Sequence, residues 1–243
     1  MAVGGLDSSA GAGLTRDLEA ITALGARPCL LATAFTLQPP GGPVTVHARD
    51  PKEIGLELRA VLGTSDTDTA VKVGMVANLS IVEMLAEALR DFPGPVVFDP
   101  VLRTSGGGQL FFGDVQGLGA LLARATIVTP NLDEARALTG QPVSTVAEAE
   151  RAGQALVASG AQAVLVKGGH LSGKAVDTLI TRQAARPFEA PRIEGPSPRG
   201  TGCALASAIA VGLAHGEPLS VAVGAAKSWL WKQIAHSHAP APE

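Results

Sequence analysis

Aromatic residues are scarce in this sequence of 243 residues, which has no tyrosine, two tryptophans and six phenylalanines. Such a composition argues against the stacking surfaces that bind single-stranded nucleic acids. An excess of positive charge is also missing, because 19 lysines and arginines stand against 22 aspartates and glutamates, for a net charge of −3. Neither nucleic acid nor an anionic membrane is therefore an expected partner.

Cysteine is almost absent too, with only Cys29 and Cys203 in the chain. Two distant cysteines make neither a disulfide framework nor a cysteine-based metal site. The first residues lack the charged and apolar segments of a signal peptide, and no apolar run reaches the roughly 18 residues that span a bilayer. We expect a soluble, cytoplasmic protein with reduced thiols.

Apolar residues, by contrast, make up 46% of the sequence, enough for one sizeable core. Short apolar segments typical of strands alternate with segments of helical periodicity. The expected strands are residues 2–5, 29–35, 70–73, 96–99, 126–129, 163–167 and 176–181. The expected helices are residues 11–24, 81–92, 115–122, 131–138, 145–160, 202–214 and 219–234, with one more that starts at Asp50 and Pro51. This alternation predicts an α/β fold with a mostly parallel sheet and helices on both faces.

The chain has no internal repeat and no linker, so we expect a single domain over residues 1–243 with a frayed tail from about residue 236. In sheets of this kind, ligands bind beyond the carboxyl ends of the strands. Residues that carry chemistry are therefore expected directly after strands.

A glycine-rich turn directly precedes the expected helix of small residues near the C-terminus. Its sequence is Arg199-Gly200-Thr201-Gly202-Cys203. Backbone N–H groups at such a helix start, together with the positive end of the helix dipole, suit a phosphate group. The same dipole is expected to lower the pKa of the Cys203 thiol and to favour the thiolate. The alternative is an ordinary helix start in which the cysteine packs as a small apolar residue.

Two further groups of polar residues follow expected strands. Asn131 and Glu134 lie one helical turn apart. Their oxygens could hold Mg²⁺, directly or through water, beside a nucleotide phosphate, or they could cap a helix. Lys167 supplies a cation at a strand end, and Gly168 and Gly169 after it allow a ligand to come close.

Two other glycine patterns fail as nucleotide-binding motifs. Residues 168–174 have the spacing of a P-loop, but Ala175 stands where serine or threonine is required, and a strand follows. Residues 11–13 begin a dinucleotide-binding fingerprint that fails at Arg16, so no NAD site is expected. The turn between the first strand and the first helix could still line a small-molecule pocket, with Asp17 one turn inside that helix.

Together and in this order, these segments resemble the ribokinase-like superfamily, and within it the hydroxymethylpyrimidine/phosphomethylpyrimidine kinases of thiamine biosynthesis. The resemblance covers nearly the whole chain, from residue 4 to about residue 234. It rests on residues 5–13, 33–38, 71–75, 99–101, 129–134, 167–170 and 200–203. Most of the superfamily has aspartate in the place of Cys203, and a cysteine there is typical of this branch and of related pyridoxal kinases.

The resemblance implies a role for each matching residue. Cys203 corresponds to the catalytic base that deprotonates the hydroxymethyl group, Lys167 to the lysine near the nucleotide phosphates, and Gly200, Thr201 and Gly202 to the anion hole for the transferring phosphoryl group. The ATP-binding residues correspond to Asn131, Glu134, Lys167, Gly169, Gly200 and Gly202, of which Asn131 and Glu134 organise Mg²⁺. The walls of the pyrimidine pocket correspond to Gly5, Asp17, Gln38, Met75 and Val101.

The implied fold is a three-layer ribokinase-like domain without a separate lid, and a homodimer is also implied. The implied activity transfers the γ-phosphoryl group of ATP to 4-amino-5-hydroxymethyl-2-methylpyrimidine and then to its monophosphate. The Gln38 amide can pair with two groups on the edge of an aminopyrimidine, and Met75 and Val101 can enclose its ring. A pyridoxal kinase on the same scaffold is an alternative, as is an inactive pyrimidine-binding module.

The chain departs from the family pattern at several positions. Ser8 and Ala10 replace a proline and a glycine in the first turn, and Arg103 and Arg199 add cations near the reacting centre. A guanidinium can hold a phosphate by two hydrogen bonds. We therefore expect at least one of these arginines, Arg199 by preference, to matter more for the monophosphate than for the free alcohol.

Overall fold

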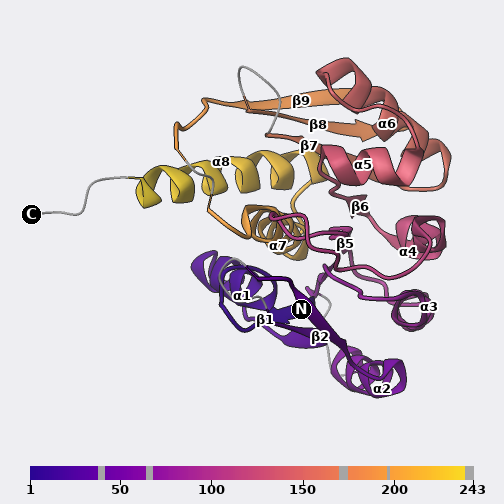
Figure 1. Cartoon of the computed structure of the whole chain (residues 1–243). Coiled ribbons are helices and arrows are strands. Elements are labelled where there is room, and N and C mark those ends of the chain that lie inside the picture. Colours follow the sequence, from indigo (N-terminus) through magenta and orange to yellow (C-terminus); the bar gives the residue numbers. More distant parts are fainter. Residues whose placement is uncertain (38–41, 64–67, 170–174, 196–197, 239–243) are drawn as a thin grey trace, which may run out of the picture.

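The computed structural model describes residues 1–37, 42–63, 68–169, 175–195 and 198–238. Within them the chain forms a nine-stranded sheet in the order β3-β2-β1-β4-β5-β6-β7-β8-β9 (Figure 1). The strands from β2 to β7 in this order are parallel, whereas β3, β8 and β9 pair antiparallel with their neighbours. The expected mostly parallel α/β fold is confirmed.

The strands and helices alternate along most of the chain. The strands are β1 Ala2–Asp7, β2 Leu30–Leu37, β3 Thr45–Ala48, β4 Val71–Val73, β5 Val96–Phe98, β6 Ile127–Val128, β7 Ala163–Gly168, β8 Ala175–Thr181 and β9 Ala185–Ala190. The α-helices are α1 Leu14–Ala23, α2 Pro51–Leu62, α3 Leu79–Ala88, α4 Gly119–Arg124, α5 Leu132–Thr139, α6 Val146–Ala158, α7 Thr201–Ala214 and α8 Leu219–Ser237, and a 3-10 helix, η1 Val115–Leu118, precedes α4.

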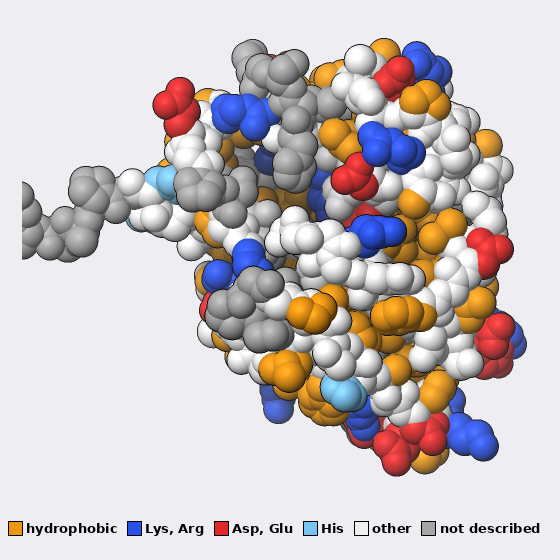
Figure 2. All heavy atoms as spheres, viewed as in Figure 1, with side chains coloured by type: hydrophobic (Ala, Val, Ile, Leu, Met, Phe, Trp, Pro, Cys, Tyr) orange, Lys and Arg blue, Asp and Glu red, His pale blue; other side chains and the backbone are white. Residues whose placement is uncertain are grey.

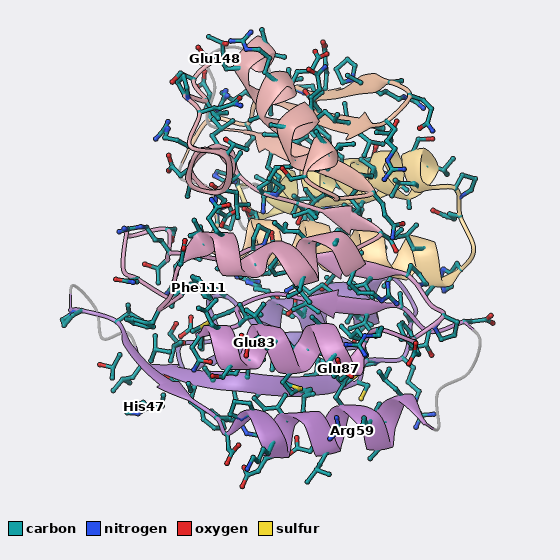
Figure 3. All side chains as sticks on the ribbon, turned by 90° about the vertical axis from the view of Figure 1, so that its right-hand side faces the viewer. His47, Arg59, Glu83, Glu87, Phe111 and Glu148 are labelled. Atoms are coloured by element: carbon teal, nitrogen blue, oxygen red, sulfur yellow. The ribbon has the colours of Figure 1, made fainter. Side chains whose placement is uncertain are left out.

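Helices cover both faces of the sheet, with α1, α7 and α8 on one face and α2 to α6 on the other (Figure 1). Each layer turns its apolar side inward. In α3, Ile81 and Leu85 are fully buried against the sheet. Glu83 and Glu87 are exposed, and Figure 3 shows them on the outer layer of helices. The apolar residues of α3 thus recur with the 3.6-residue period of a helix, as they do in the sequence. Their burial against the sheet stabilises this layer of helices.

Several helices begin directly after a polar residue whose side chain caps them. The Asp50 side chain accepts a hydrogen bond from the Lys52 N–H, with Pro51 as the first helical residue of α2. Thr145 caps α6 by accepting from the Glu148 N–H, at the expected position. Such caps satisfy amides that the helix itself leaves unpaired.

Two strands were not expected from the sequence, β3 and β9. Both lie at the edges of the sheet and are largely exposed. An edge strand with little burial needs no apolar alternation, and Pro187 within β9 is tolerated only because an edge strand can spare an N–H group. The last helix also continues to Ser237, beyond the start of the expected frayed tail, whose last residues, 239–243, lie outside the described part.

The carboxyl ends of the parallel strands meet at one edge of the sheet. Asp7 ends β1, Asp99 directly follows β5, and Lys167 lies at the end of β7. The N-terminus of α7 is close to the same edge, since a side chain on Gly202 would come within 3.1 Å of the Lys167 Nζ. Among the described residues, no helix has the length and hydropathy that crossing a membrane requires.

Candidate active site

A lysine and an aspartate form the centre of this edge. The Lys167 Nζ lies 2.6 Å from the Asp99 Oδ1, and the Thr129 hydroxyl donates to the same oxygen over 3.0 Å. Burial alone would raise the pKa of Asp99, but the ammonium groups of Lys167 and Lys72 hold it below its usual value. Asp99 is therefore a buried carboxylate that keeps its negative charge at neutral pH.

The second Asp99 oxygen, Oδ2, is buried and has no hydrogen-bond partner among the described residues. A Cβ atom placed on Gly202 would lie 3.9 Å from this oxygen and 3.1 Å from the Lys167 Nζ. The absence of a side chain at Gly202 thus leaves space between the start of α7, the lysine and the carboxylate. Since an unpaired buried carboxylate oxygen is costly, its presence points to a partner that binds there.

The turn before α7 needs glycine for its backbone. Gly200, the N-cap of α7, is left-handed with φ 77°, a conformation that L-residues avoid. A Cβ atom there would also meet the Arg16 side chain at 2.6 Å and the Gly11 carbonyl at 2.9 Å. No side chain caps α7, so the proposed anion hole at residues 200–202 stays a prediction with which this helix start is compatible.

Cys203 lies in the first turn of α7 and is partly buried. The expectation of a lowered thiol pKa is wrong for the free chain. Burial raises the pKa of Cys203 to about 11, although the charge of Lys72 and a hydrogen bond from the Gly13 backbone act in the opposite direction. Desolvation is the largest cause of the raised pKa, and the negative charges of Asp17 and Asp99 raise it further.

Asp17 lies beneath this site and not on its surface. Its side chain is fully buried, and both of its oxygens accept hydrogen bonds from the Lys72 ammonium, over 2.8 and 2.9 Å. The Ser207 hydroxyl, one helical turn after Cys203 on α7, donates to it over 2.8 Å. The carboxylate proposed as a pocket wall is thus bound internally, where it joins α1, β4 and α7.

Asn131 and Glu134 form a capping box at the start of α5. The Asn131 Oδ1 accepts from the Glu134 N–H over 2.9 Å, and the Glu134 Oε2 accepts from the Asn131 N–H over 2.7 Å. Burial raises the pKa of Glu134 to about 7, with Lys167 acting against it and Asp99 with it. The cap that the sequence offered as an alternative is present, and it engages the Asn131 Oδ1 and one of the two Glu134 oxygens that were expected to hold Mg²⁺.

The residues expected around the pyrimidine are partly brought together. Gly5 and Met75 are in contact, since a Cβ atom on Gly5 would lie 2.6 Å from the Met75 sulfur. Val101 is partly buried, two residues after Asp99. Gln38 lies outside the described residues. Gly169 is exposed at the end of β7, where its carbonyl accepts from Arg192 over 2.9 Å.

The two additional arginines have different surroundings. Arg103 is exposed and donates to the Gly107 carbonyl within its own loop. Arg199 instead reaches the turn after β1, where its Nη2 lies 3.1 Å from the Asp7 Oδ2. Arg199 is thus the one of these two cations that connects separate parts of the site.

Sequence reasoning did not single out Asp99 or Lys72 as site residues, although both belong to the segments it noted. The signal for Asp99 was available, because a carboxylate directly after a buried strand lies at the ligand-binding edge. Lys72 carried a weaker signal, a charged residue inside an apolar strand, which indicates a buried ion pair. Its partner, 55 residues away in sequence, could not be read from the chain.

Comparison with known proteins identifies the family of this chain. The family model for phosphomethylpyrimidine kinase matches residues 7–242. The chain belongs to this family. A hydroxymethylpyrimidine/phosphomethylpyrimidine kinase of Rhizobium meliloti (strain 1021) is 39% identical over 96% of this chain and 89% of its own length. The kinase of the same name from Streptomyces coelicolor is 38% identical over 95% of this chain and 86% of its own.

Solved structures show the same fold. The phosphomethylpyrimidine kinase of Clostridium difficile superposes with a TM-score of 0.81 at 32% identity, covering 96% of this chain and 97% of that one. An ADP complex of Bacillus subtilis pyridoxal kinase gives a TM-score of 0.85 at 30% identity, covering 93% of this chain and 88% of that one. The chain is therefore a kinase-family member with the fold shared by phosphomethylpyrimidine and pyridoxal kinases.

Proposed function

We propose that this protein transfers the γ-phosphoryl group of ATP to a hydroxymethylpyrimidine and then to the resulting monophosphate, in thiamine biosynthesis. The observation that carries the proposal is the site formed by Lys167, Asp99 and the start of α7, where a cation and unobstructed amides face a common space. Such a site suits the transfer of a phosphoryl group, which depends on positioning and on charge stabilisation. Relatives matching nearly the whole chain are named for this activity.

In the first transfer, the hydroxymethyl oxygen attacks the γ-phosphorus, the bond from that phosphorus to the β–γ bridging oxygen breaks, and ADP leaves. The hydroxyl proton passes to a base, for which Cys203 is the proposed acceptor. The backbone N–H groups of Gly200, Thr201 and Gly202, with Lys167, stabilise the negative charge on the transferring group. In the second transfer the attacking atom is an oxygen of the monophosphate, and the products are the diphosphate and ADP.

Mg²⁺ would reach this site with the phosphates of ATP, since such ions are usually bound by substrate phosphates and one or two carboxylates. The free oxygen of Asp99 fits that role as a direct ligand. Asn131 and Glu134 would act through water, because the Asn131 Oδ1 and the Glu134 Oε2 are engaged in the cap of α5. When bound, the ion would neutralise negative charge on the phosphoryl oxygens.

The pyrimidine is proposed to lie beside Gly5, between Met75 and Val101, with its polar edge recognised by Gln38. Met75 is 6% exposed and touches the strand that carries Gly5, so it offers an apolar surface next to backbone groups. Asp17 would support this wall from beneath through Lys72 and would not touch the ring.

A pyridoxal kinase is the second candidate, supported by the similarity to pyridoxal kinase structures. Pyridoxal has no exocyclic amine, so the proposed amide pairing of Gln38 favours the aminopyrimidine. A coupled assay of ADP release with the hydroxymethylpyrimidine, its monophosphate and pyridoxal tests the choice. We expect higher kcat/KM for both pyrimidines than for pyridoxal. No turnover of either pyrimidine at millimolar concentration would overturn the proposal, and preferred turnover of pyridoxal would establish the second candidate.

A homodimer in the cytoplasm is proposed as the working form. Leu6 of β1 pairs in register with Phe35 of β2, and Leu37 follows on the same side of β2. These three large apolar side chains are 38%, 48% and 55% exposed, and Figure 2 shows hydrophobic side chains at the surface over the region of β1, β2 and α2. An exposed apolar group of this kind suits burial against a second copy. Light scattering of the purified protein measures its mass in solution: twice the mass of one chain would support the homodimer, and the mass of a single chain would overturn it.

A further inference from the structure

Arg199 connects two segments that flank the start of α7. Its Nη2 lies 3.1 Å from the Asp7 Oδ2, and its Nη1 donates to the Ser9 hydroxyl over 3.2 Å. Asp7 is the last residue of β1, Ser9 lies in the turn between β1 and α1, and Arg199 directly precedes Gly200, the N-cap of α7. The guanidinium therefore lies between the turn at the pyrimidine side and the anion hole.

The turn is shaped to receive this guanidinium. A Cβ atom on Gly11 would lie 2.9 Å from the Arg199 Nη1 and 3.1 Å from its Cζ, so the guanidinium lies directly against the backbone of Gly11. Asp7 is held in place by its own contacts, because both of its oxygens accept from the Ser9 hydroxyl and one of them from the Ser9 N–H. Ser9 thus orients the Asp7 carboxylate that receives the guanidinium.

The contact between Arg199 and Asp7 is open to exchange. The Arg199 side chain is 40% exposed, so water screens this side of the pair, and Asp7, which is 8% exposed, keeps its hydrogen bonds from Ser9 when the guanidinium moves away. A phosphate dianion offers a guanidinium two charge-assisted hydrogen bonds and more negative charge than one carboxylate. An anionic substrate at the mouth of the anion hole can therefore compete with Asp7 for this group.

Neighbouring cations are less suited to the same task. Lys167 is paired with Asp99 at the nucleotide side of the site. Arg16, which also approaches Gly200, pairs with Glu19 over 2.6 Å on its own helix. Arg103 bonds to a carbonyl in its own loop.

We propose that Arg199 is a specificity-determining residue for the phosphorylated substrate: it exchanges its contact with Asp7 for the phosphate of the pyrimidine monophosphate. The inference rests on the proposed function and deepens it. In the second transfer two polyanions approach each other, and a guanidinium beside the anion hole reduces their repulsion. In the first transfer the acceptor is a neutral alcohol and has no phosphate for Arg199 to bind.

The experiment measures kcat/KM of ATP-saturated enzyme for the alcohol and for the monophosphate in two variants. Arg199→Ala is expected to lose about tenfold or more with the monophosphate and less than about threefold with the alcohol. Asp7→Asn keeps an oxygen for the Ser9 N–H but removes the charge that competes for Arg199. It should leave the preference for the monophosphate unchanged or increase it. Arg90→Ala is the control, because Arg90 is an exposed arginine that pairs with Glu87 on α3, away from the site.

Equal losses with both acceptors in Arg199→Ala, while the wild type phosphorylates both, would overturn the inference and leave the proposed function standing. An Asp7→Asn variant that loses activity with the monophosphate to the same extent as Arg199→Ala would also overturn it, since the pair would then serve only to hold the turn. A wild-type protein that phosphorylates neither pyrimidine would overturn the proposed function, and this inference with it.

Discussion

At the scale of single residues, the site combines groups whose charges depend on one another. Lys167 and Lys72 keep Asp99 ionised, and the positive charge of Lys72 opposes the effect of burial on the pKa of Cys203. With a pKa of about 11, Cys203 is almost entirely a thiol at neutral pH in the free chain. The hydroxymethyl proton can therefore pass only to the small fraction of Cys203 that is thiolate, unless binding of the ligands lowers the pKa of the thiol.

The two proposed transfers differ in whether a base is needed, and this gives a prediction for Cys203→Ser. The hydroxymethyl group must lose a proton, whereas a phosphate monoester is already a dianion at about pH 8, since its second pKa is about 6. We expect the variant to lose about 10²–10⁴-fold in kcat with the alcohol and less than about tenfold with the monophosphate. Initial rates at saturating ATP measure both.

Equal losses with the two acceptors would show that Cys203 contributes by its position and not by removing a proton. Cys203→Ser is expected to slow mainly the transfer to the alcohol, whereas Arg199→Ala is expected to slow mainly the transfer to the monophosphate. Serine is close in size to cysteine and can form the same hydrogen bond with the Gly13 backbone, so the fold should be unaffected.

At the scale of helices and strands, most of the secondary structure could be predicted from the sequence, because buried strands and amphipathic helices carry their own patterns. The Asp50 and Asn131 caps were readable for the same reason, since a cap depends on residues within one turn. The edge strands β3 and β9 were not readable, because they bury little. The pairing of Arg199 with Asp7, 192 residues apart, arises only from the fold.

The capping box of α5 also carries a prediction about stability. Glu134 has a pKa of about 7 in the folded chain against an ordinary value of 4.5. Between these values the folded state binds more protons than the unfolded state, so the free energy of unfolding falls as pH rises from about 4.5 to 7 and then levels off. The shift corresponds to a contribution on the order of 3 kcal/mol.

Glu134→Gln is the variant that isolates this effect, because glutamine can keep the cap by accepting from the Asn131 N–H but carries no charge. We expect it to be more stable than the wild type at pH about 8 and nearly equal at pH about 5. Urea unfolding at both values measures the difference. The same difference at both pH values would show that the Glu134 carboxylate is not the titrating group. Glu83→Gln, which removes one negative charge at an exposed position of α3, serves as the control.

At the scale of the whole molecule, the layer formed by α1, α7 and α8 is joined to the sheet by buried polar contacts as well as by the core. Lys72 of β4 is 1% exposed and binds Asp17 of α1, which also accepts from Ser207 of α7. These residues lie beneath Cys203, so the packing of α1 and α7 on the sheet and the electrostatics of the site depend on the same ion pair.

Removal of one member of this pair should be far more damaging than removal of both. In Lys72→Met the Asp17 carboxylate would stay buried without its counter-charge, at a cost of about 3–5 kcal/mol in the free energy of unfolding. Part of this loss should be recovered as pH falls, because the isolated carboxylate can then take up a proton. The double variant Lys72→Met/Asp17→Asn removes both charges and keeps an acceptor for Ser207, so it should be more stable than the single variant. Urea unfolding of the three proteins at pH about 7 tests this, and a double variant no more stable than Lys72→Met would show that the pair is not the origin of the loss.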